Sequence, residues 1–148
     1  MKKCDLETRL NPYQYGFYLS ALTDSSNKSY IVRFGLTFSK PIKEEQLSRI
    51  KQWMYGLPEI FAKLEIHGSE SVPVLVSTEP RIDIIPEEHC LSLSQSGAIS
   101  LEDDRLYRIY AAQSGKEITS LYFLLHHILV DQTGVETVIS NLSSFLQD

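Results

Sequence analysis

Hydrophobic residues recur along this chain with two different periods, which together predict strands and helices in alternation. Every second residue is apolar in the segment 29–38, the pattern of a strand with one buried face. From residue 39 to about residue 55 the apolar positions follow helical spacing, and a helix is expected there. The other expected elements are helices over 12–22 and 133–146 and strands over 60–66, 72–77, 81–85, 106–112 and 118–125.

Two segments decide the expected arrangement of these elements. The strand 118–125 is almost wholly apolar, so it should be central in its sheet and covered on both faces. The segment 86–100 is the least regular, and a surface loop or a short irregular helix is expected there. The predicted fold class is therefore α/β or α+β, with a mixed sheet covered by helices.

Length and composition limit the classes of protein that remain. A chain of 148 residues, 43% hydrophobic and 22% charged, predicts one globular domain that spans residues 1–148. Its net charge of -5 and scattered basic residues argue against a nucleic acid or an anionic membrane as partner. No segment is apolar enough to span a membrane, and residues 4–7 interrupt any secretory signal, so a cytoplasmic location is expected.

The sequence has no CxxC motif and no cluster of cysteines with histidines. Cys4 and Cys90 are far apart, and no pair of cysteines has zinc-ligand spacing, so a structural zinc site is not expected. The acidic run 102–104 directly precedes a predicted strand. Three consecutive carboxylates are poor geometry for one cation, which favours a solvated loop.

The strongest candidate for chemistry is the pair His126 and His127, followed by Asp131. Neighbouring side chains of a strand face opposite ways, so the two imidazoles should lie in different environments. Histidine is the favoured general base near neutral pH, and Asp131 could orient an imidazole, pair with an arginine or cap the next helix. Structural roles for all three residues remain an alternative.

The segment His126-His127-Ile128-Leu129-Val130-Asp131 matches the HHxxxD core of the condensation domains of nonribosomal peptide synthetases. Related acyltransferases with the chloramphenicol-acetyltransferase fold carry the same core. Residues 10–18 also resemble the opening helix of that family, and residues 36–59 resemble its strand, proline turn and second helix. The order and spacing of these segments agree over nearly the whole chain, which resembles the N-terminal lobe of a two-lobed domain.

This resemblance implies acyl transfer from a carrier-protein thioester to an amine or hydroxyl, forming an amide or ester. It places His127 beside the acceptor, where it removes a proton or orients the attacking group. Asp131 would hold the loop through a salt bridge, and His126 would pack and hydrogen-bond. The substrate would arrive on the phosphopantetheine of a carrier protein, so no directly bound cofactor or metal is expected. Carrier domains and a C-terminal lobe are the implied partners.

Two departures from the family pattern keep other functions open. Gln132 stands where the family has a glycine, and the second motif keeps Glu59 without the usual arginines. Asp131 would then need Lys63 or Arg33 as its partner. A non-catalytic module that binds carrier proteins or a partner lobe is one alternative. Another is a homo-oligomeric, coenzyme A-dependent acyltransferase that completes its channel between subunits.

Overall fold

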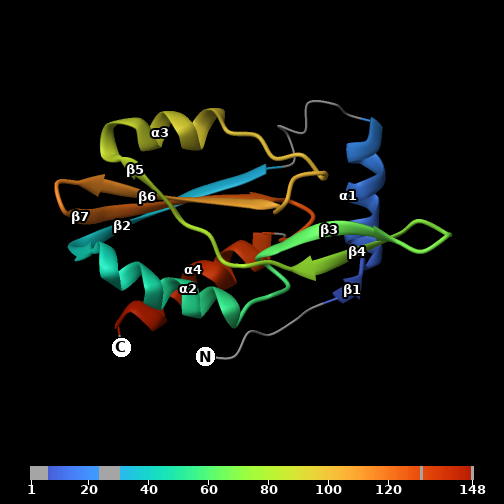
Figure 1. Cartoon of the computed structure of the whole chain (residues 1–148), viewed down its shortest axis with the longest axis horizontal. Helices are drawn as coiled ribbons and strands as arrows, with labels where there is room; N and C mark the ends of the chain where they lie inside the picture. Colours follow the sequence, from blue (N-terminus) through green and yellow to red (C-terminus); the bar gives the residue numbers. More distant parts are fainter. Residues whose placement is uncertain (1–6, 24–30, 131, 148) are drawn as a thin grey trace.

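A four-stranded mixed sheet forms the centre of the computed structural model, which describes residues 7–23, 31–130 and 132–147. The strand order is β2-β7-β6-β5 (Figure 1). β7 pairs antiparallel with both neighbours, and β5 runs parallel to β6. The bounds are Ile31–Lys43 for β2, Asp83–Pro86 for β5, Tyr107–Ser114 for β6 and Glu117–His126 for β7. The predicted fold class and the central place of the apolar strand are confirmed.

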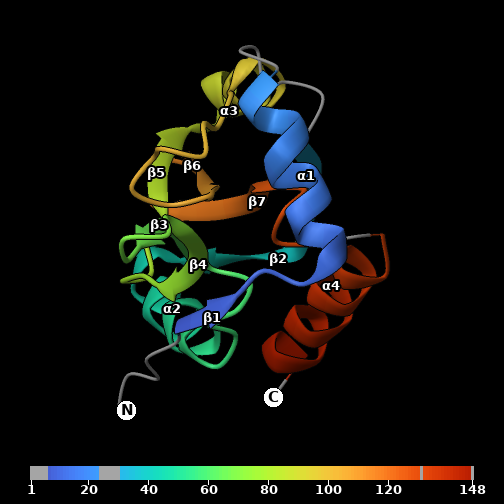
Figure 2. The same ribbon diagram turned by 90° about the vertical axis from the view of Figure 1, so that its right-hand side faces the viewer.

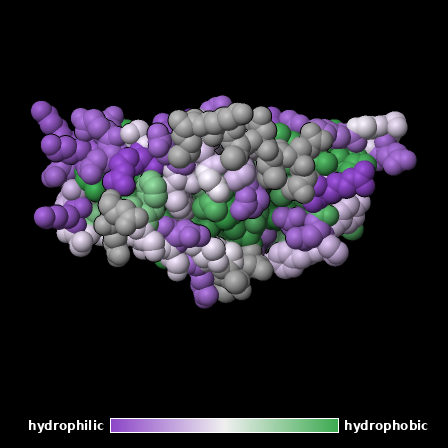
Figure 3. Space-filling view, turned by 90° about the horizontal axis from the view of Figure 1, so that it is seen from below, coloured by the Kyte–Doolittle hydropathy of each residue, from purple (hydrophilic) through white to green (hydrophobic). Residues whose placement is uncertain are grey.

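Helices cover this sheet on both faces. α3 (Glu87–Ser96) lies on one face, and α2 (Leu47–Tyr55) and α4 (Gln132–Gln147) lie on the other (Figure 1). α1 (Pro12–Thr23) runs across one end of the sheet, from the side of α3 to the side of α4 (Figure 2). Seen from the side of α2 and α4, the surface is largely hydrophilic around an apolar area in its middle (Figure 3).

A second, three-stranded sheet was not predicted. It consists of β1 (Glu7–Arg9), β3 (Ala62–His67) and β4 (Val72–Ser77) in the antiparallel order β1-β4-β3. The Leu106 N–H donates to the Ala62 carbonyl at 2.9 Å, which links this sheet to the segment before β6. The sequence predicted the two longer strands, but their pairing into a separate sheet depends on contacts between distant segments.

The core lies between the central sheet and its helices. Along β7 the side chains from Leu121 to His126 are buried with the exception of half-buried Tyr122, because helices cover both faces. On α2 the buried positions are Leu47, Ile50, Trp53 and Met54, which have the predicted helical spacing. Phe61 packs edge-on against Trp53 and Tyr107, with ring centroids 5.5 and 5.3 Å apart. Aromatic contacts of this kind join α2 to the sheet.

One predicted boundary is wrong, and one segment is more regular than expected. β2 continues through Pro41 to Lys43, and a 3₁₀ turn, η2 (Glu44–Gln46), precedes α2. Pro41 fits because β2 is an edge strand and its pairing with β7 is irregular between Thr37 and Ile42. The segment 86–100 contains the regular ten-residue helix α3. It has no apolar stripe, because small Cys90 and Ser94 are buried while Leu91 is exposed.

Within the described residues, no helix is both long and apolar enough to cross a membrane.

Candidate functional site

His126 is the last residue of β7 and is completely buried. Its Nδ1 accepts a hydrogen bond from the Ile128 N–H at 3.0 Å, so the neutral ring carries its proton on Nε2. Burial, and secondarily the neighbouring His127, lower the pKa of His126 to about 4. His126 is therefore neutral at pH 7 and fixes the backbone of the turn that follows β7.

His127 is half-buried and faces α1. Its ring stacks on Phe17, with centroids 5.2 Å apart and an interplanar angle of 8°. Its Nδ1 is buried, and no atom of the described part of the chain hydrogen-bonds to that nitrogen. The expectation that the two imidazoles lie in different environments is confirmed: His126 is enclosed in the core, and His127 is half-buried against Phe17.

Gln14 of α1 also contacts this turn. Its Nε2 donates to the Ile128 carbonyl at 2.9 Å. At the start of the helix, the Gln14 N–H donates to Asn11 Oδ1 at 2.8 Å and the Asn11 N–H donates to Gln14 Oε1 at 3.0 Å. From the sequence, Gln14 was noted only as part of residues 10–18, which resemble the opening helix of the family. The Asn-x-x-Gln spacing is the available signal, since it is typical of a capping box.

Asp131 lies outside the described residues, so its predicted role remains a prediction. The two cations considered as its partners make other contacts. Lys63 Nζ lies 2.9 Å from Glu65 Oε2. Arg33 donates to the Ser94 carbonyl at 2.6 Å and to the Gly97 carbonyl at 2.7 Å, which fixes the end of α3. None of these contacts reaches the histidine turn.

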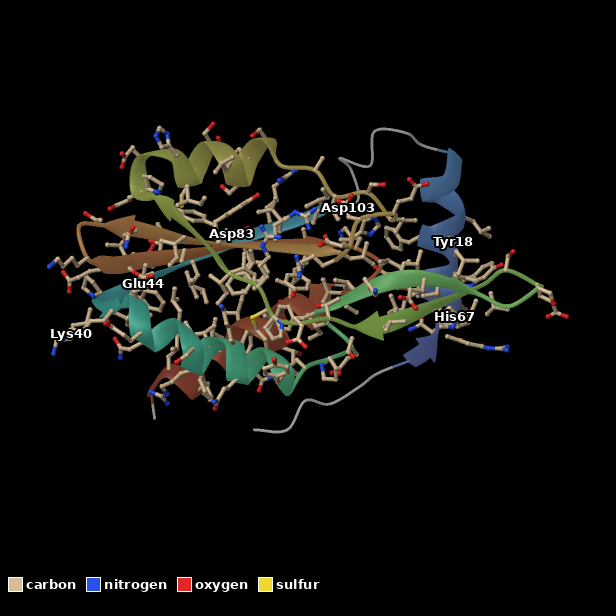
Figure 4. All side chains as sticks on the ribbon, in the orientation of Figure 1. Tyr18, Lys40, Glu44, His67, Asp83 and Asp103 are labelled. Carbon is tan, nitrogen blue, oxygen red and sulfur yellow. The ribbon has the colours of Figure 1, made fainter. Side chains whose placement is uncertain are left out.

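In the acidic run 102–104 before β6, Asp103 and Asp104 form ion pairs with neighbouring arginines. Asp103 Oδ2 lies 3.0 Å from Arg108 Nη2 and accepts the Ser100 N–H at 3.1 Å. Asp104 lies 3.2 Å from Arg105. Figure 4 shows Asp103 and the similarly paired Asp83 away from Lys40, which is at the far end of the molecule. Among the described residues, no three or more potential metal ligands are grouped.

A shallow groove of about 160 Å³ borders the histidine turn on the side of Ile128. It lies between the start of α1, the end of the turn and the first residues of α4, and His127 does not line it. Its lining residues are Asn11, Tyr13, Gln14, Ile60, Ile128, Leu129, Val130 and Gly134. The groove therefore borders the contact between Gln14 of α1 and Ile128 of the turn.

Comparison with known proteins assigns the fold. No protein-family model and no curated protein matches the sequence. The starter condensation domain of rhizomide synthetase RzmA matches 92% of this chain with a TM-score of 0.75 and 11% identity. The four-domain nonribosomal peptide synthetase AB3403 matches 99% of it with a TM-score of 0.74 and 14% identity. The chain has the fold of the N-terminal lobe of a condensation domain.

The match extends to a related domain and covers only part of each protein. The epimerization domain of tyrocidine synthetase TycB3 matches 98% of this chain with a TM-score of 0.67 and 14% identity. This chain spans 36% of the starter condensation domain, 36% of the epimerization domain and 12% of AB3403. The chain is thus a condensation-domain-like module about a third as long as the single domains that it matches.

Proposed function

We propose that this chain is the N-terminal lobe of a condensation-type acyltransferase in which His127 acts on the acceptor. The observation that carries the proposal is the placement of His127. This imidazole lies in the turn directly after the central strand, is half-buried, and stacks on Phe17 of α1. A general base needs this combination of fixed orientation and partial access.

The proposed reaction joins an acyl group to an amine or hydroxyl. The acceptor attacks the thioester carbonyl, the new C–N or C–O bond forms, and the C–S bond to phosphopantetheine breaks. His127 removes or orients the acceptor proton, which passes finally to the departing thiolate. His126 holds the turn, Asp131 would hold the loop through a salt bridge, and neither a metal nor a nucleotide is expected to take part.

The proposed partners follow from the size of the chain. Because it spans only about a third of the condensation domain with the same fold, a second lobe would supply the facing wall of the site. Carrier proteins would deliver the thioester to that site. A cytoplasmic location is part of the same proposal.

A second candidate is a non-catalytic module that binds carrier proteins or a partner lobe. Two observations favour it. Gln132 replaces the family's glycine, and both Arg33 and Lys63 contact residues other than the histidine turn.

A single-turnover assay distinguishes the two functions. The chain is combined with its second lobe, an acyl-loaded carrier protein and an acceptor amine, and product is followed by mass spectrometry. His127→Ala should lower the rate by about 10²- to 10⁴-fold, the usual contribution of a positioned base. Tyr15→Phe, on the exposed side of α1, is the control and should retain the rate. Unchanged transfer by His127→Ala would refute the catalytic proposal.

A further inference from the structure

The side chain of Gln14 bonds at both ends of its amide. Its Oε1 accepts the Asn11 N–H at 3.0 Å, within α1. Its Nε2 donates to the Ile128 carbonyl at 2.9 Å, across 114 positions of sequence. The first contact closes the start of the helix, and the second joins that helix to the histidine turn. A single side chain therefore has two separable functions that use different atoms.

The contact with Ile128 is the second of two hydrogen bonds that hold the backbone next to His127. The Ile128 N–H already donates to His126 Nδ1 at 3.0 Å, and the Ile128 carbonyl accepts from Gln14. These two groups belong to the successive peptide units that follow His127. With both engaged, the main chain leaving His127 is held from the core by His126 and from α1 by Gln14.

The ring of His127 is held by the same helix. Phe17 lies one helical turn after Gln14 and stacks flat on the imidazole, with ring centroids 5.2 Å apart. A shift of α1 relative to the turn would therefore change this stacking. The Gln14–Ile128 hydrogen bond is a polar contact that joins this helix directly to the turn.

We infer that Gln14 is a positioning residue for His127, acting through the Ile128 carbonyl. The use of a fixed His127 in acyl transfer rests on the proposed function. The structural link between Gln14 and His127 does not depend on it. The competing role is that of a helix cap alone, in which the contact with Asn11 matters and the contact with Ile128 does not.

Two substitutions separate these roles. Gln14→Glu keeps an oxygen to accept the Asn11 N–H but replaces the donor to Ile128 with a second oxygen, which repels the carbonyl. Gln14→Lys keeps a donor for Ile128 and loses the acceptor for Asn11. Gln46→Glu is the matched control, because Gln46 Oε1 accepts the Lys43 N–H at 2.8 Å in an equivalent cap remote from His127.

The experiment is nuclear magnetic resonance on the whole chain, with His127 ring signals assigned through His127→Gln. In the parent protein, the flat stack on Phe17 should shift His127 ring protons upfield. Gln14→Glu should abolish at least half of that shift and speed hydrogen exchange of the Ile128 amide about tenfold, the loss of one net hydrogen bond. Gln14→Lys and Gln46→Glu should leave both signals near their parent values.

The opposite pattern would overturn the inference. If Gln14→Lys disturbs the His127 ring and Gln14→Glu does not, Gln14 is only a cap. If neither variant moves the ring signals, α1 is positioned by packing alone, and the inference is also overturned. Because these signals require no acyl transfer, they stand independently of the His127→Ala assay, and each proposal can fail without the other.

Discussion

The two neighbouring histidines lie in different environments because His126 ends β7 and His127 begins the turn that follows. His126 is enclosed in the core and has its pKa lowered to about 4, whereas His127 lies half-buried against Phe17. The period of two of a strand predicted this difference from the sequence. The contacts of Gln14 and Phe17 with the turn were not predicted, because more than a hundred residues separate α1 from it. No local pattern specifies such pairs.

The lowered pKa of His126 predicts a pH-dependent stability. The unfolded chain takes up a proton near pH 6.5, whereas the folded chain does so only near pH 4. Between these values the unfolded state binds more protons, so the free energy of unfolding should fall as the pH is lowered from 6.5 to about 4. The contribution of this residue is about 1 kcal/mol per pH unit and on the order of a few kcal/mol in total.

The measurement is urea unfolding of the parent protein and His126→Asn at pH 7 and pH 4. Asparagine keeps an oxygen to accept the Ile128 N–H but does not titrate. The stability difference between parent and variant should shrink at pH 4. His89→Asn, on the exposed side of α3, provides a control for the removal of a histidine. A difference that is the same at both pH values would show that protonation of His126 is not linked to folding.

At the scale of elements, the sequence predicted every helix and strand whose inner face is apolar throughout. The apolar segment 118–125 was predicted as a strand and lies in β7. The helical spacing of Ile50 and Met54 predicted the helix that is α2. α3 was not predicted as a regular helix, because polar and tertiary contacts rather than an apolar stripe hold it. Arg33 on β2 donates to the Ser94 and Gly97 carbonyls at the end of α3. Such a contact leaves no signal in the hydrophobic pattern of α3.

Gly97 lies where the end of α3 closely approaches the sheet. A larger residue at this position should lower the free energy of unfolding. A Cβ at Gly97 would lie 2.7 Å from Leu124 Cδ2 and 3.0 Å from the Leu93 carbonyl oxygen. Leu124 is fully buried and the Leu93 group is backbone, so neither can move freely. Gly97→Ala should therefore lower the free energy of unfolding by about 1–3 kcal/mol.

Gly16 on α1 is the matched control for this substitution. No atom lies within 4 Å of a Cβ built there, apart from the neighbours that any helix provides. Gly16→Ala should raise the free energy of unfolding by up to about 1 kcal/mol, since alanine is the better helix former. Denaturant unfolding of both variants checks the pair. Equal effects at the two glycines would contradict the tight approach of α3 to β7.

At the scale of the whole molecule, the fold class followed from the alternation of strands and helices, but the second sheet did not. The strands β3 and β4 were expected. The third strand of this sheet, β1, pairs with β4 and has only three residues, which is too short to give a hydrophobic pattern. The size of the chain bears on whether it works alone or with a partner. It has the fold of a condensation-domain lobe and spans 36% of the starter condensation domain. We therefore expect this module to present His127 to a partner.

Whether substrate reaches His127 can be measured by titrating the isotope-labelled chain with a carrier protein. An acyl-phosphopantetheinyl carrier should shift the resonances of His127, Ile128 and Phe17. The same carrier without its phosphopantetheine should leave these resonances unchanged. Shifts confined to other surfaces, such as the hairpin of β3 and β4, or identical shifts with both carriers, would contradict the claim.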